Sequence, residues 1–121
     1  MLFRSREAAG NLLVAEKRVL MREFEKRNPP SFSGDQGPLA TEDWLQRINR
    51  IFDFILLEDN ATRINAASLM FMNEALQWWN CTLGTHLLAG MTWATFERLF
   101  LKKYFPEDNQ NAMQSEFFNL K

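Results

Sequence analysis

The sequence predicts an all-α protein: a compact bundle of about five helices, preceded by an extended Pro/Gly strap and an N-terminal helix. Five glycines and four prolines in 121 residues are too few for the closely spaced turns of an all-β sandwich. Several segments place apolar residues three or four positions apart, and none gives a credible strand. The hydrophobic fraction of 46 %, with eleven phenylalanines and four tryptophans, supplies the core of one soluble domain.

The first expected element is a charged helix that fills most of residues 1–28. Leu13, Leu20 and Phe24 lie at helical spacing, but the apolar stripe spans barely two heptads, so it suggests a coiled coil only weakly. Asn28-Pro29-Pro30 ends the helix, because proline cannot continue the hydrogen-bond ladder. We treat this segment as a separate unit that can be loosely attached.

An extended strap is expected at residues 29–40. Its first ten residues, "PPSFSGDQGP", contain three prolines and two glycines, so the chain there must be extended or turned. Phe32 is the one large apolar side chain in these ten residues. An isolated aromatic residue in a solvated linker usually docks on a neighbouring surface, so we expect the strap to lie over the domain.

Residues 41–121 are expected to form the helical domain, and its first helix spans about 41–57. Thr41 is the predicted N-cap, with Glu42 and Asp43 at the positive end of the helix dipole. One face of the 3.6-residue repeat is apolar and the other polar. The predicted inner face holds Trp44, Leu45, Ile48, Ile51, Phe52, Ile55 and Leu56. The predicted outer face holds Gln46, Arg47, Asn49, Arg50 and Asp53.

Two further helices are expected between residues 60 and 83. Asn60 is the predicted cap of the first, whose inner face holds Ile64, Ala67 and Phe71. Asn73 is expected to separate the two helices, because asparagine tolerates left-handed backbone geometry.

The second of these helices contains the adjacent pair Trp78-Trp79. Neighbouring helical residues point about 100° apart, so the two rings belong to different stripes. Trp78 aligns with Ala75 and Thr82, and Trp79 aligns with Leu76 and Leu83. A helix that is apolar over this width lies between other helices, so both rings are predicted to be in the core.

The last helices are expected on either side of Pro106. Thr92 is the predicted cap of a helix with one aromatic face, and Pro106 ends that helix. The aromatic face holds Trp93, Phe96, Phe100 and Tyr104. A final helix, capped by Asp108 or Asn109, would hold Met113, Phe117 and Leu120 on one face, and we expect it to be truncated at Lys121.

The charge distribution argues against a nucleic-acid interface in the main body. Residues 1–28 contain seven basic and four acidic side chains, a balance of +3, so the remaining seven basic and eleven acidic side chains give −4. Phosphate binding needs clustered Lys and Arg, which residues 29–121 lack. The mixed charges of residues 1–28 favour a solvated helix over an anion-binding one.

We find no residue set that could carry catalysis, so we expect no enzyme, no cofactor, no metal and no small-molecule substrate. His86 is the one histidine and Cys81 the one cysteine, too few ligands for a zinc site. No phosphate-binding glycine loop is present. A single free cysteine suits an intracellular, cytoplasmic setting, and we see neither a signal peptide nor a membrane span.

Three ordered pieces of the sequence resemble a known family. They are "PPSFSGDQGPLATEDWLQRINRIF" at 29–52, "EALQWW" at 74–79 and "MTWATFERLFLKKYFPEDNQNAMQSEFFNL" at 91–120. Together they resemble the retrotransposon gag domain, the capsid-type domain of Gag polyproteins in gypsy-class LTR retrotransposons of plants. The motif residues that we assign to the core are Phe32, Trp44, Leu45, Ile48, Phe52, Ala75, Trp78, Trp79, Trp93, Phe96, Phe100, Tyr104, Phe105, Pro106 and Phe117.

The resemblance implies a fold like that of a retroviral capsid N-terminal domain, which packs with copies of itself into a shell around the element's RNA. RNA binding is then expected only through regions outside this chain, which has no zinc knuckle, and no membrane partner is implied. Asn73 stands where the family commonly has glycine, which keeps the tolerance for left-handed geometry. We assign the assembly contact to the outer face of the 41–57 helix, with Arg47, Arg50 and Asp53 as candidates.

Two other interpretations remain open at this stage. The chain can be a monomeric, domesticated adaptor that binds extended peptides in a groove near Phe32. It can also be a fragment of a decayed element with no selected function.

Overall fold

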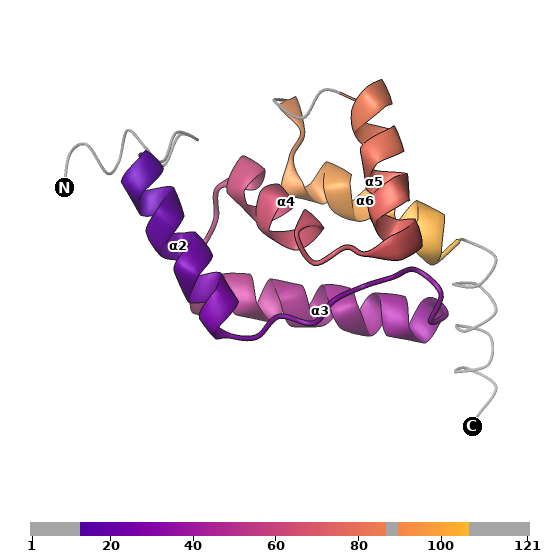
Figure 1. Ribbon diagram of the computed structural model, residues 1–121, viewed down its shortest axis with the longest axis horizontal. Helices are drawn as coiled ribbons and strands as arrows, with labels where there is room; N and C mark the ends of the chain where they lie inside the picture. Colours follow the sequence, from indigo (N-terminus) through magenta and orange to yellow (C-terminus); the bar gives the residue numbers. More distant parts are fainter. Residues whose placement is uncertain (1–12, 87–89, 107–121) are drawn as a thin grey trace.

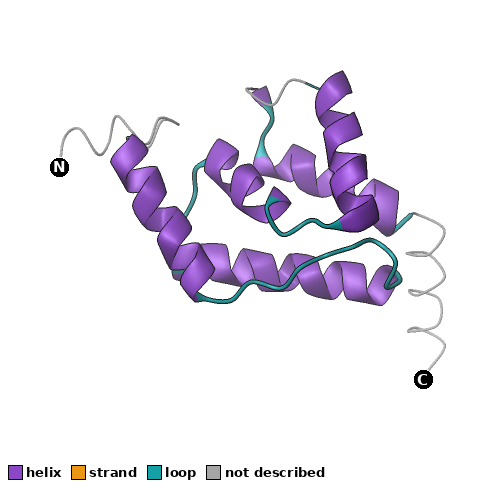
Figure 2. Cartoon of the chain, viewed as in Figure 1, coloured by secondary structure: helices purple, strands orange, loops and turns teal. Residues whose placement is uncertain are grey.

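The computed structural model describes residues 13–86 and 90–106, which contain five α-helices (Figures 1 and 2). These are α2 (Val14–Lys26), α3 (Pro38–Phe54), α4 (Asn60–Ser68), α5 (Asn73–Thr85) and α6 (Trp93–Tyr104). The described residues form no strand, and one isolated parallel bridge joins Phe32 to Phe71. The prediction of an all-α bundle is therefore confirmed. The final helix predicted after Pro106 lies outside the described residues.

Helix α3 forms the base of the domain. In Figure 1, α4, α5 and α6 lie on one side of α3, α2 crosses its C-terminal end, and the strap runs back along it. The helix begins three residues earlier than expected, so Thr41 as its cap is wrong. Gly37, with φ of 95°, turns the chain and Pro38 takes the first helical position, where its missing N–H costs nothing. Thr41 lies one turn inside α3, and its hydroxyl donates to the Gly37 carbonyl at 3.0 Å.

The end of α3 also differs from the prediction. The helix stops at Phe54, and Leu56 takes a left-handed conformation with φ of 61°. The helical periodicity of the sequence continues to Leu56, but this side chain points outward and is 80 % exposed.

The cap of α4 is Asp59 rather than Asn60. The Asp59 carboxylate accepts the Thr62 N–H at 3.0 Å, whereas the Asn60 side chain accepts the Trp93 N–H at 2.9 Å.

Aromatic rings from every helix except α4 converge in one core. The predicted inner faces of α4 and α6 are buried as expected, and Thr92 caps α6 by accepting the Thr95 N–H at 3.1 Å. In α5 the buried stripe is Ala75, Trp79 and Thr82. The prediction that both tryptophan rings lie in the core therefore holds for Trp79, whereas Trp78 is half-buried at the edge of the core and Leu76 is exposed.

Helix α2 packs on the domain through the buried Phe24, with Leu20 and Met21 partly buried against the same core. Phe24 is fully buried and stacks on Phe52 of α3, with ring centroids 5.6 Å apart. The Arg27 guanidinium, just after α2, lies 4.4 Å from the centroid of the Phe54 ring. The described part of the N-terminal segment therefore contacts the C-terminal end of α3 at two points.

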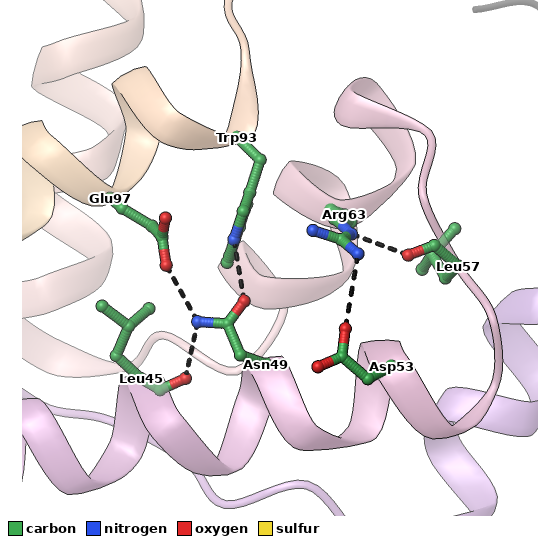
Figure 3. Close-up of polar contacts among 7 residues, drawn as sticks. All are labelled: Leu45, Asn49, Asp53, Leu57, Arg63, Trp93 and Glu97. Atoms are coloured by element: carbon green, nitrogen blue, oxygen red, sulfur yellow. Dashed lines mark hydrogen bonds and ion pairs between the residues drawn. The ribbon is translucent and has the colours of Figure 1, made fainter.

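Asn49 connects α3 to α6, although the sequence placed it on the outer face. Its Oδ1 accepts from Trp93 Nε1 at 2.9 Å, and its Nδ2 donates to a Glu97 oxygen at 2.8 Å (Figure 3). The amide also donates to the Leu45 carbonyl within α3. Asn49 lies at the boundary between the two faces of α3, where periodicity alone cannot say whether a residue meets a neighbouring helix.

We predict that Asn49→Leu destabilises the fold by about 1–3 kcal/mol, because the indole N–H of Trp93, a residue 5 % exposed, loses its acceptor. The measurement is the free energy of unfolding from urea denaturation. Asn80→Leu is the matched control, since Asn80 is an exposed residue of α5. Equal effects of the two substitutions would remove the proposed role of Asn49.

Candidate functional site

The described residues contain no group of three His, Cys, Asp or Glu side chains that could hold a metal ion. None of the described helices combines the length and apolar character that a membrane span requires. His86 and Cys81 are both exposed, and Nδ1 of the His86 ring lies within hydrogen-bond distance of the Thr85 hydroxyl and the Thr82 carbonyl. The features that can carry function are therefore the docked strap and the outer surfaces of the helices.

Phe32 inserts the strap into the centre of the aromatic core. Its side chain is 1 % exposed. Four rings surround it, with centroids 5.0–6.1 Å from its own: Trp44, Phe71, Phe100 and Tyr104. Two of these contacts are edge-to-face, the arrangement that the ring quadrupoles favour. The strap is thus part of the core, as its single large apolar residue predicted.

The strap backbone is held as a short strand would be. The Phe32 N–H donates to the Met70 carbonyl at 2.9 Å, and the Met72 N–H donates to the Phe32 carbonyl at 3.0 Å. The Ala75 N–H, at the start of α5, donates to the Ser33 carbonyl at 3.0 Å. Trp44 Nε1 donates to the Pro30 carbonyl at 2.7 Å. Four hydrogen bonds therefore fix the direction of the strap across the domain.

Gly34 allows the strap to turn against Tyr104. Its φ is +97°, and a Cβ at this position would lie 2.8 Å from Cε1 of the Tyr104 ring. The Tyr104 hydroxyl is buried, and it has no hydrogen-bond partner among residues 13–86 and 90–106. Burial, with a smaller contribution from the negative charge of Glu74, raises the pKa of Tyr104 from 10.0 to about 12. The hydroxyl therefore stays protonated at neutral pH, and nothing in its surroundings would activate it as a nucleophile.

The motif residues do not all lie in the core. Most of those assigned to it are buried: Phe32, Trp44, Leu45, Ile48, Phe52, Ala75, Trp79, Trp93, Phe96, Phe100, Tyr104 and Phe105. Trp78 is half-buried, with its ring edge-on to Phe71 and Tyr104, and Pro106 is exposed. Phe117 lies outside the described residues. The structure brings eleven of these buried residues into one continuous cluster, and Phe105 lies beside that cluster at the end of α6.

The candidate assembly residues Arg47, Arg50 and Asp53 are all exposed on α3. Arg47 forms an ion pair with Asp43 one turn earlier, at 2.8 Å, and both side chains are well solvated. Asp53 lies 3.8 Å from Arg63 of α4 (Figure 3). An ion pair between two solvated side chains, such as Arg47–Asp43, contributes little free energy.

Sequence reasoning missed two features of this surface. Arg63 of α4 is largely buried, donates to the Leu57 carbonyl at 2.7 Å and lies over the Phe52 ring (Figure 3). Its position in a short polar stretch gave no signal of this. Phe54 is the second: it is 66 % exposed on α3, whereas the expected outer face listed only polar residues. The helical periodicity already placed Phe54 away from the apolar inner face of this helix.

The comparison with protein families identifies a capsid-like domain. A family model described as the N-terminal capsid-like domain of the retrotransposon-derived protein PEG10 matches residues 26–105. These residues run from the end of α2 to the residue after α6, and they include the strap. Searches of curated proteins and of solved structures returned no match.

The buried hydroxyl of Tyr104 predicts a loss of stability at alkaline pH. Because its pKa is raised to about 12, the folded chain keeps the proton between pH 10 and 12 while the unfolded chain releases it. Stability is therefore complete below pH 10 and falls as the pH rises toward 12. Tyr104→Phe should show a smaller alkaline loss in urea denaturation and keep its stability at neutral pH, because the hydroxyl has no partner to lose.

Tyr104 is the chain's one tyrosine, so ultraviolet absorbance of the phenolate reports this residue alone. A titration with its midpoint near pH 10 in the folded protein would contradict the burial of the hydroxyl.

Proposed function

This chain belongs to the PEG10-type family of retrotransposon-derived, capsid-like domains, and from that premise we propose that it is the self-assembly domain of a Gag protein. The family is a structural one, not a catalytic one, in agreement with the expectation that the chain is not an enzyme. In this proposal many copies pack through repeated homotypic contacts into a shell around an element's RNA. The RNA is contacted through regions outside this chain, and the plant gypsy-class origin remains part of the proposal.

One observation supports assembly above all: α3 is held rigidly from inside while its outer side stays exposed. Its buried face contacts the strap through Trp44 and α6 through Asn49, so the helix cannot shift without breaking the core. Its exposed side carries Arg47 and Arg50, so the helix presents both residues at fixed positions on the domain. A contact surface that is already ordered loses little conformational entropy when a partner binds.

The contact proposed here is polar and weak by itself. Exposed ion pairs are worth about 0–1 kcal/mol, so a single pairing of two copies through Arg47, Arg50 and Asp53 would be transient. An assembly that repeats this contact many times is more stable than one pair, because each additional contact within a closed assembly forms at a high effective concentration. A net charge of −1 also leaves little long-range repulsion between copies.

We predict that the chain self-associates as its concentration rises from micromolar to millimolar, as measured by light scattering coupled to size separation. Reversing both charges in Arg47→Glu/Arg50→Glu should weaken association by about tenfold or more, since like charges then face the acidic groups of the partner. The control is Arg98→Glu/Lys102→Glu, which makes the same charge change at exposed positions of α6. A chain that stays monomeric throughout this range would overturn the assembly proposal.

A second candidate function, a peptide-binding adaptor, is favoured by the way the strap is held. One inserted ring and strand-like backbone hydrogen bonds are the means by which many domains bind extended peptides. In this candidate the strap occupies a groove around Phe32 that an external segment of similar sequence could enter.

The adaptor candidate is tested with a labelled peptide of residues 28–37, "NPPSFSGDQG", added to the full chain. We expect no binding in fluorescence anisotropy, because the tethered strap competes at a high effective concentration and its ring fills the site. Saturable binding that disappears with a Phe32→Ala peptide would instead favour the adaptor. Repeating the titration with the Phe32→Ala chain removes the competing ring.

A further inference from the structure

Two large apolar residues at the C-terminal end of α3, Phe54 and Leu56, are exposed. Phe54 is 66 % exposed, and Leu56, at 80 %, is the most exposed large hydrophobic residue in the described part of the chain. The fold of a single copy leaves most of both side chains in solvent. In Figure 1 this end of α3 lies beside the C-terminal end of α2, away from α5 and α6.

The backbone of Leu56 is also in an unfavourable conformation, with φ of 61°. The Leu57 N–H donates to the Phe52 carbonyl at 2.9 Å, and the Leu56 N–H donates to the Asp53 carbonyl at 3.3 Å. This is the Schellman arrangement, whose left-handed position favours glycine or asparagine. The other two left-handed positions held by non-glycine residues in the described chain are both asparagines, Asn28 and Asn73. A leucine is strained in this backbone conformation. Because its side chain is largely exposed, its burial contributes little to the stability of a single copy.

The charges around this apolar pair are arranged so that the surface can pair with a copy of itself. The Arg27 guanidinium covers one side of the Phe54 ring at 4.4 Å. Asp53 and Glu58, both exposed, flank the pair along the chain. Arg27 also lies 3.7 Å from Glu23, and Asp53 lies 3.8 Å from Arg63, both within one copy. A two-fold contact joins the same patch of both copies, so a basic group of one copy can meet an acidic group of the other.

We propose that Phe54 and Leu56 form the centre of a two-fold contact between two copies of this chain. Arg27 of each copy lies toward the acidic side chains Asp53 and Glu58 of the other. This surface does not include Arg47 or Arg50, although it shares Asp53 with the contact proposed above, and the inference rests on the proposed self-association. A two-fold contact alone closes a dimer, so a shell needs it together with a different contact, such as the outer face of α3.

Leu56→Asn separates this contact from a role in folding. Asparagine suits the left-handed position, so the variant should unfold at the same or a higher temperature than the wild-type chain. Its two-fold dimer should nevertheless dissociate about tenfold or more readily, because the apolar centre is lost. Phe54→Ser, which leaves the left-handed position unchanged, should weaken the dimer in the same way.

Leu39→Asn is the matched control, because Leu39 is equally an exposed leucine, 66 % accessible, at the opposite end of α3. It should leave the dissociation constant unchanged. Sedimentation velocity of the full 121-residue chain over a range of concentrations measures the constant, and circular dichroism measures the unfolding temperature.

The possible outcomes distinguish the two proposals. Dimers that are weakened by Leu56→Asn, but that do not grow further in the wild-type chain, support the two-fold contact and count against the shell. Self-association that both Leu56→Asn and Phe54→Ser leave unchanged overturns the two-fold contact alone. A lower unfolding temperature for Leu56→Asn assigns Leu56 to folding and also overturns the contact. A strictly monomeric wild-type chain overturns both proposals.

Discussion

The insertion of Phe32 into the aromatic core is the contact on which the rest of the structure depends. Its ring touches α3 through Trp44, the turn before α5 through Phe71, and α6 through Phe100 and Tyr104. Removing a buried phenylalanine ring costs about 3–5 kcal/mol, a large part of the stability of a small domain. The strap therefore acts as the piece that joins the helices, although its composition is that of a linker.

The polar groups of the core restrict how the helices can be placed. A buried indole N–H needs a hydrogen-bond acceptor. Trp44 donates to the Pro30 carbonyl in the strap, and Trp93 donates to the Asn49 side chain in α3. Apolar contacts tolerate sliding, whereas these hydrogen bonds require one register. They fix α3 against the strap and against α6, which makes its outer side a defined surface.

The helical periodicity predicted the five described helices and most of their buried faces, because core-facing residues must repeat every 3.6 positions. The periodicity gave wrong predictions where backbone geometry sets the end of a helix, or where a neighbouring helix sets which way a residue faces. The start of α3 depends on the turn at Gly37, and its end depends on the left-handed Leu56, which continued the apolar pattern. Asn49 was assigned to the solvent because a boundary residue faces whichever helix packs beside it. The assembly residues stay predictions, since exposure does not identify a partner.

The two proposed contacts lie on one helix, and this has a consequence for assembly. At 1.5 Å per residue, the 17 residues of α3 form a rod about 25 Å long, with Arg47 and Arg50 near its middle and Phe54 at its end. The rod is held by Trp44 and Asn49, so the angle between the two contacts cannot change without breaking the core. The curvature of an assembly built from them would then be set by the interior of each copy, and the strap, which helps to hold α3 through Trp44, would help to determine it.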